Sequence, residues 1–95
     1  MEKLNYYLNP QYDKVKSFYN KAEVVDYGEV KYLYSYNTLV CTLRNDKLEL
    51  NYNIEESLLF GRTTLRHIKE FLKQHFENGE RFKTKKEVIE FAINK

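Results

Sequence analysis

The sequence has few of the residues that build specialised scaffolds: it contains 1 Cys, 1 Pro, 3 Gly and no Trp among 95 residues. A single Cys excludes a disulfide-rich fold and a zinc site made of cysteines. Three isolated glycines exclude a glycine-rich phosphate loop, and one Pro excludes a proline-rich chain. No apolar run approaches the roughly 20 residues that a membrane-spanning helix needs. We therefore expect a soluble protein that is not held in a membrane.

The start of the chain lacks the apolar core of a secretion signal, because residues 1–9 mix charged, polar and tyrosine side chains. With no export signal, the lone thiol of Cys41 is expected to stay reduced in the cytosol. The hydrophobic share of 42% suits a folded domain. We expect a cytoplasmic protein in which residues 1–95 form a single domain.

Alternation of apolar and polar residues with a period of two predicts four strands, over residues 21–27, 30–36, 39–44 and 47–52. Short turns separate them, at Gly28, at Asn37-Thr38 and at Asn45-Asp46. This pattern is typical of an antiparallel meander. Before it, Asn9-Pro10 suits the start of a helix, and a short N-terminal helix is expected over about residues 10–19.

After residue 61 the apolar residues recur every three or four positions, which predicts a helix that begins at Thr63 or Thr64 and stops at Asn78-Gly79. Thr84 and Glu87 then form a capping box that opens a last helix. The predicted fold class is α+β, with a four-stranded antiparallel meander packed on one face by these two C-terminal helices.

Residues that could carry catalysis or bind metal are few. His67 and Glu70 have the i, i+3 spacing of some metal-binding helices, but no second such pair follows. The helical wheel places His75 on the apolar face, as a partly buried, hydrogen-bonded histidine, and His67 at its margin. Cys41 alternates with Leu39 and Leu43, so we expect it on their face as a small buried hydrophobe. We therefore expect no enzymatic activity, metal ion or cofactor.

Positive charge gathers in the C-terminal part, where residues 62–95 carry 9 basic and 5 acidic side chains, against 7 and 9 in residues 1–61. Four of these cations fall within about 60° on the wheel of the first helix: Arg62, Arg66, Lys69 and Lys73. Cations near a helix N-terminus oppose the helix dipole, and such placements often serve a partner. The alternative is a solvated face on which Glu70 and Glu77 neutralise Arg66 and Lys73.

All 9 tyrosines lie between Tyr6 and Tyr52. Tyr32, Tyr34 and Tyr36 alternate along one predicted strand and would point to one side of it. If that side is open, Tyr34 and Tyr36 offer a platform for stacking bases or docking a protein. If it faces the helices, these rings belong to the core.

Three stretches carry a family resemblance: KSFYNKA at 16–22, SYNTLV at 35–40 and TTLRHIKEFL at 63–72. Together they resemble a group of small uncharacterised proteins of bacteriophages and mobile elements of low-GC bacteria. The resemblance brings no established activity. It implies a phage-type protein, and many small phage proteins without enzymatic motifs bind a host protein, anti-CRISPR and other anti-defence inhibitors among them.

We therefore expect a non-enzymatic binding module that inhibits or redirects a host protein, such as a CRISPR effector or another nucleic-acid-handling complex, in the host cytosol. The alternative is direct nucleic-acid binding, with phosphates on the four cations and bases on Tyr34 and Tyr36. A third interpretation is self-assembly, for example as a homodimer, through the exposed edges of the meander.

Overall fold

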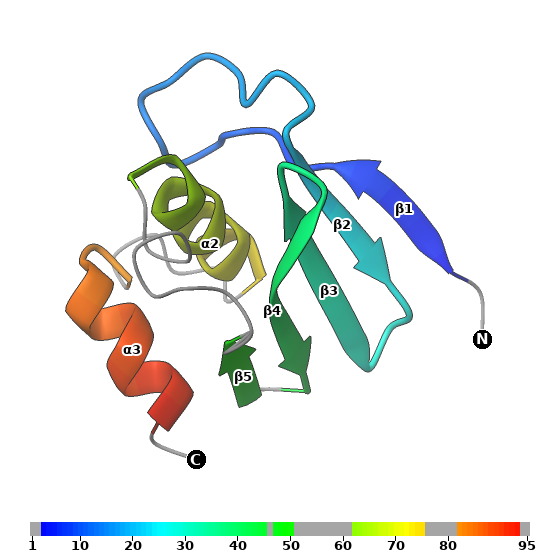
Figure 1. Cartoon of the computed structure of the whole chain (residues 1–95), viewed down its shortest axis with the longest axis vertical. Helices are drawn as coiled ribbons and strands as arrows, with labels where there is room; N and C mark the ends of the chain where they lie inside the picture. Colours follow the sequence, from blue (N-terminus) through cyan, green and yellow to red (C-terminus); the bar gives the residue numbers. More distant parts are fainter. Residues whose placement is uncertain (1–2, 46, 51–61, 76–81, 94–95) are drawn as a thin grey trace.

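The computed structural model describes residues 3–45, 47–50, 62–75 and 82–93, and the described parts form an antiparallel sheet and two helices (Figure 1). The elements are β1 (Leu4–Tyr7), β2 (Ala22–Asp26), β3 (Val30–Ser35), β4 (Thr38–Arg44), β5 (Lys47–Leu50), α2 (Arg62–His75) and α3 (Lys85–Ile93). The five strands follow one another across the sheet in chain order. The α+β class and the antiparallel meander are confirmed.

The sheet has five strands rather than the four that we expected, because β1 adds an edge strand next to β2. β1 pairs with β2 from Leu4 opposite Asp26 to Tyr7 opposite Glu23. All four of its residues are exposed, so it has no alternation of buried and exposed positions for a sequence pattern to reveal.

The β3–β4 turn lies one residue earlier than expected, at Tyr36-Asn37 instead of Asn37-Thr38. Both residues have positive φ, 52° and 65°, as in the type I′ turns that join two strands with two residues. Tyr36 therefore belongs to the turn and not to the strand.

The pairing of β3 with β4 shifts its register between Leu33 and Tyr34, and this shift puts Leu39 on a different face from the one that we expected. Cys41 pairs with Leu33, whereas Leu39 pairs with Tyr34, with one extra residue on β4 between them. Directly paired residues of a sheet point to the same side. Cys41 is buried, as expected, and pairs with the buried Leu33. Leu39, which pairs with Tyr34, lies on the opposite face.

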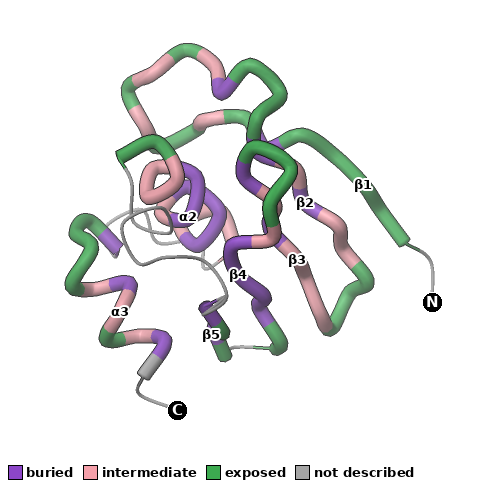
Figure 2. The backbone as a smooth tube through the Cα atoms, viewed as in Figure 1, coloured by how far each residue is buried: buried purple, intermediate pink, exposed green. Residues whose placement is uncertain are grey.

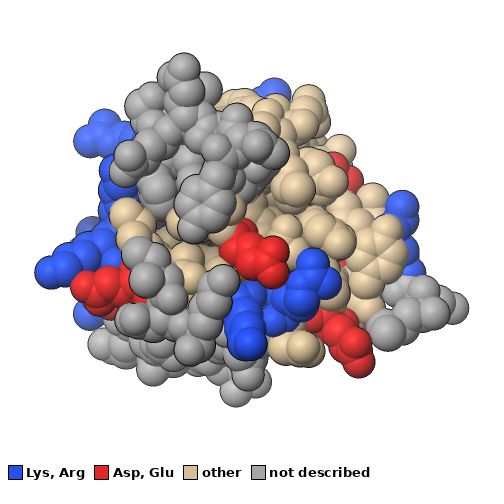
Figure 3. Space-filling view, turned by 60° about the horizontal axis from the view of Figure 1, so that its bottom comes forward, with Lys and Arg blue, Asp and Glu red and all other residues tan. Residues whose placement is uncertain are grey.

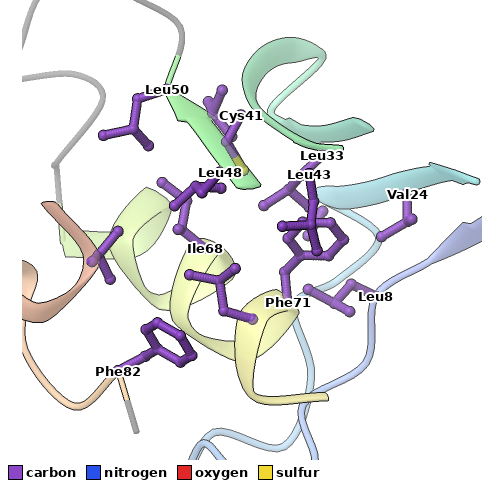
Figure 4. Close-up of a cluster of buried hydrophobic side chains, with 14 of the residues drawn as sticks. Leu8, Val24, Leu33, Cys41, Leu43, Leu48, Leu50, Ile68, Phe71 and Phe82 are labelled. Atoms are coloured by element: carbon purple, nitrogen blue, oxygen red, sulfur yellow. The ribbon is translucent and has the colours of Figure 1, made fainter. Parts of the chain in front are cut away.

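The core fills the space between the sheet and the two helices (Figures 2 and 4). α2 lies against β3 and β4, and α3 lies against β5. Figure 4 shows Leu33 and Leu48 of the sheet directed toward Ile68 and Phe71 of α2. The apolar spacing in the sequence correctly predicted this face of α2.

The starts of the two helices differ in how well they were predicted. α3 has the expected capping box, because the Thr84 hydroxyl accepts the Glu87 N–H at 3.2 Å and the Glu87 carboxylate accepts the Thr84 N–H at 3.2 Å. α2 begins at Arg62, before the two threonines. Its predicted stop at Asn78-Gly79 lies outside the described residues.

Among the described helices, none is long and apolar enough to cross a membrane.

The expected N-terminal helix does not form. Residues 9–21, which we call the N-terminal loop, run irregularly from β1 over α2 to β2 (Figure 1). Side chains satisfy the backbone locally: the Asp13 carboxylate accepts the Val15 N–H, and the Ser17 hydroxyl accepts the Tyr19 N–H. Such bonds compete with helix formation.

Candidate functional site

A buried carboxylate of α2 holds the N-terminal loop in place. The Glu70 side chain is 1% exposed. It accepts the backbone N–H groups of three consecutive residues at 2.9–3.0 Å: Gln11, Tyr12 and Asp13. The Gln74 amide also donates to Glu70 and to the Asn9 carbonyl oxygen, at 2.7 Å in the latter case. The loop is therefore attached to α2 by a charge-assisted set of hydrogen bonds.

This arrangement changes the expected charge balance of α2. Glu70 was expected to neutralise Arg66 in the solvated-face alternative, but its carboxylate is directed to the loop backbone. Glu77, the second expected neutralising residue, lies outside the described residues. No ion pair between two described residues involves Arg66 or Lys73.

The four cations of the predicted stripe differ in their surroundings. Arg66 and Lys73 are half-buried beside the N-terminal loop. The Lys69 ammonium donates to the Lys83 carbonyl oxygen at 3.1 Å, which gives it a structural role in joining α2 to the start of α3. Arg62 is exposed at the first position of α2 and lines neither of the cavities described next.

Two adjoining cavities lie between the N-terminal loop and α2. The larger, about 650 Å³, also borders the β3–β4 turn. Its lining consists of Lys14, Val15, Lys16, Ser17, Phe18, Tyr19, Lys21, Tyr36, Thr63, Arg66 and His67. The smaller, about 240 Å³, is lined by Tyr12, Asp13, Lys14, Arg66, Lys69, Glu70 and Lys73. We call the two together the basic groove, because they share Lys14 and Arg66.

The basic groove concentrates unpaired positive charge. In the part of the chain that the structure describes, no ion pair involves Lys14, Lys16 or Lys21. The two carboxylates of the smaller cavity, Asp13 and Glu70, both accept backbone N–H groups. By contrast, acidic and basic side chains intermingle on the lower side of the molecule (Figure 3). The groove is thus a local basic surface on a nearly neutral protein.

The tyrosines that we grouped on one strand face are separated by the structure. Tyr34 is half-buried on β3, on the opposite face from the buried Leu33 and Ser35. The ring of Tyr36 lies 5.9 Å from the ring of His67, on the α2 side of the sheet. Tyr36 therefore joins Arg66 at the basic groove, and Tyr34 does not.

His75 is half-buried, as expected. His67 was expected at the margin of the apolar face, but it is fully buried. His67 Nδ1 lies 2.8 Å from the Ser35 hydroxyl, and its ring packs edge-on against Phe18 at 4.6 Å. Burial lowers the pKa of His67 to about 4, although nearby Asp13 acts in the opposite direction. The ring is therefore neutral at pH 7.

The described residues offer little for catalysis or metal binding. No group of three or more His, Cys, Asp or Glu side chains among them is arranged to hold a metal ion. The Cys41 thiol is buried and its pKa is raised by burial, which disfavours the reactive thiolate.

Sequence reasoning missed half of the groove, namely Lys14, Lys16, Lys21 and Tyr19 of the N-terminal loop. Their contribution depends on the attachment of the loop to Glu70, which is 57 residues or more away in the sequence. One local signal was available: the pair Tyr-Asn occurs at 19–20, 36–37 and 52–53. Tyr19 and Tyr36 line the larger cavity, and the third pair lies outside the described residues.

Comparison with curated proteins and with solved structures finds no match to this chain. A family match does extend over residues 6–90, and so includes the N-terminal loop, β2 to β5, α2 and most of α3. The chain therefore belongs to the family described as "Family of unknown function (DUF8033)".

Proposed function

We propose that this protein is a non-enzymatic module that binds single-stranded nucleic acid in the basic groove. The observation that carries the proposal is the meeting of two distant segments, the N-terminal loop and α2, which together surround one concave surface with cations and tyrosine rings. Cations attract phosphates, and aromatic rings stack on bases.

The low net charge of +2 does not oppose this function, because affinity depends on the charge that faces the ligand. Five groove cations form no ion pair among the described residues: Lys14, Lys16, Lys21, Arg66 and Lys73. Each phosphate contact made by such a cation releases a counterion and strengthens binding at low salt.

A single strand fits the groove better than a duplex. Tyr19 is 77% exposed and Tyr36 is also exposed, so both have ring surface free for stacking. Stacking on a side chain requires an unpaired base whose face is accessible, as in single strands. Duplex recognition relies instead on an element that enters a groove.

The proposal is tested by fluorescence anisotropy with labelled 20-nucleotide single strands of DNA and RNA, and with a duplex, at low salt. We expect micromolar binding of a single strand and weaker binding of the duplex. Arg66→Gln/Lys73→Gln should weaken binding at least 10-fold. Lys69 is left unchanged in this variant because of its hydrogen bond to Lys83.

The matched control is Lys3→Gln/Lys47→Gln, which removes the same charge from exposed positions outside the groove. It should bind like the wild type. No binding of any single strand at micromolar protein, or equal losses in the two variants, would reject the proposal.

A second candidate is the binding of a host protein, through which a phage-type protein would inhibit or redirect a CRISPR effector or another host complex. The resemblance to phage proteins supports it, and so does the exposed edge strand β1, where Leu4 is 63% and Tyr7 52% exposed. Tyrosine and accessible strand edges are common at protein interfaces.

The two candidates separate in a pull-down from nuclease-treated host lysate. A host protein captured by the wild type and by Arg66→Gln/Lys73→Gln, but lost in Leu4→Asp/Tyr7→Asp, would favour the second candidate. A solution mass of two chains, reduced to one by the same β1 variant, would assign β1 to a homodimer instead.

A further inference from the structure

We infer that the larger cavity of the basic groove is a nucleotide subsite, in which Tyr19 and Tyr36 hold one base and the surrounding cations hold its phosphate. The inference rests on the proposed function, since it specifies what one part of the groove would recognise. Three observations support it: the backbone conformation of two turns, the residues that line the cavity, and one buried histidine.

The Tyr-Asn pairs at 19–20 and 36–37 occupy equivalent turns. Tyr19 and Asn20 have φ of 53° and 61°, close to the 52° and 65° of the Tyr36-Asn37 turn. The first turn is closed by the Lys21 N–H, which donates to the Phe18 carbonyl oxygen at 2.9 Å. The turns are adjacent, because the Tyr36 N–H donates to the Lys21 carbonyl oxygen at 2.8 Å.

Tyrosine is an unusual residue for the first position of such a turn. Positive φ at both central residues favours Asn, Asp or Gly, and a bulky side chain is rarely found there. Asn20 and Asn37 follow this preference, whereas Tyr19 and Tyr36 do not. Residues held in unfavourable backbone conformations are concentrated at binding and active sites. The feature shared by the two tyrosines is the cavity that both of them line.

The cavity has the composition that a nucleotide requires. Its volume of about 650 Å³ is in the range of small-ligand sites. Two exposed tyrosines of its lining provide stacking surface. Cations of the loop and of α2, namely Lys16, Lys21 and Arg66, provide the charge that attracts a phosphate group.

His67 adds a polar atom that lacks a partner in the described part of the chain. The side chain is 0% exposed and lines the same cavity. Nδ1 is paired with the Ser35 hydroxyl, but Nε2 has no hydrogen-bond partner among the described residues. Buried polar atoms are rarely left unpaired, so a base or sugar atom that enters the cavity would supply the missing partner.

The inference is tested by nuclear magnetic resonance titration of the whole chain at pH 7 with three probes: uridine 5′-monophosphate, uridine and inorganic phosphate. We expect the monophosphate to shift the amide signals of both Tyr-Asn turns and the ring signals of His67. Uridine and phosphate should each bind at least 10-fold more weakly, because each provides only half of the contacts. A repeat with adenosine 5′-monophosphate compares the affinity for a purine nucleotide with that for the pyrimidine nucleotide.

The decisive variant is Tyr19→Asn/Tyr36→Asn, because Asn suits both turn positions and leaves the backbone in place. It should lose at least 10-fold in affinity for the monophosphate. Tyr7→Thr, which removes an exposed tyrosine outside the cavity, should change the affinity less than twofold. Unchanged binding in the double variant would overturn the inference, as would phosphate binding as tight as the monophosphate.

Failure of this inference is distinguishable from failure of the proposed function. Single strands that bind the groove without any monophosphate shifts at the two turns would overturn the nucleotide subsite and keep the proposed function. Monophosphate binding without any single-strand binding would do the reverse. Signals that move only at β1 or β5 would also reject the subsite.

Discussion

Tyr19 illustrates at the level of one residue how stability and binding can conflict. Its φ of 53° is unfavourable for tyrosine, and its side chain is 77% exposed, so the ring contributes little packing. We predict that Tyr19→Asn raises the free energy of unfolding by about 0.5–1 kcal/mol, because Asn tolerates this conformation better. Urea denaturation at pH 7 measures the change. A loss of stability would show that the ring packs in the folded protein.

The buried His67 makes a second prediction, on pH. Because its pKa falls from 6.5 in the unfolded chain to about 4 in the folded protein, the unfolded state binds a proton first as the pH drops. The stabilising effect of the neutral ring is thus complete above pH 6.5 and is lost as the pH falls toward 4. One pKa unit corresponds to about 1.4 kcal/mol, which sets an upper limit of about 3 kcal/mol.

The measurement compares urea denaturation of the wild type and His67→Gln between pH 7.5 and pH 4. Carboxylates also titrate in this range, so the difference between the two proteins isolates the histidine. We expect the wild type to lose more stability than the variant over this interval. Parallel curves would contradict the lowered pKa.

At the level of elements, the attachment of the N-terminal loop to α2 depends on Glu70. We predict that Glu70→Gln lowers the free energy of unfolding by about 2–4 kcal/mol, because an amide nitrogen replaces one acceptor of the buried Glu70 side chain next to partly buried N–H groups. Amide hydrogen exchange should accelerate at Gln11, Tyr12 and Asp13. The control Glu49→Gln breaks an exposed ion pair with Arg44 and should cost under about 0.5 kcal/mol.

The elements that the sequence predicted correctly are those with strong local patterns. Alternation revealed β2 to β5, the spacing of apolar residues revealed α2, and Thr84 with Glu87 revealed the start of α3. The incorrect predictions involve partners distant in the sequence. β1 is held by β2, and the N-terminal loop takes its path from contacts with Glu70. Local propensity at Asn9-Pro10 favours a helix, but it does not include these contacts.

Only the part of the candidate site on α2 could be predicted, because its residues share one element, whereas the N-terminal loop reaches the site through distant contacts. A helical wheel brought Arg66, Lys69 and Lys73 together, because they share one element. The wheel placed Arg62 with them, but Arg62 lines neither cavity of the groove, which faces the N-terminal loop. Tyr36 was grouped with Tyr34 because alternation was continued into a turn where the backbone changes direction.

For the whole molecule, the arrangement separates folding from binding. The core lies between the sheet and the helices (Figure 2). The basic groove lies between the N-terminal loop and α2. Ion pairs of the described residues, such as Arg44–Glu49 and Lys86–Glu90, lie outside the groove. Substitutions of the exposed groove residues are therefore expected to change binding more than stability, whereas Phe18, His67, Lys69 and Glu70 also hold the fold together.

The last prediction concerns the salt dependence of single-strand binding, which distinguishes local charge from net charge. Contact by all five groove cations that form no ion pair with another described residue would give a slope of log Kd against log salt of about 3–4, at about 0.7 for each phosphate contact. Lys16→Gln/Lys21→Gln should lower this slope by about 1.4. Lys3→Gln/Lys47→Gln changes the net charge equally, from +2 to 0, and should leave the slope unchanged. Equal slopes in the two variants would mean that net charge, and not the basic groove, governs binding.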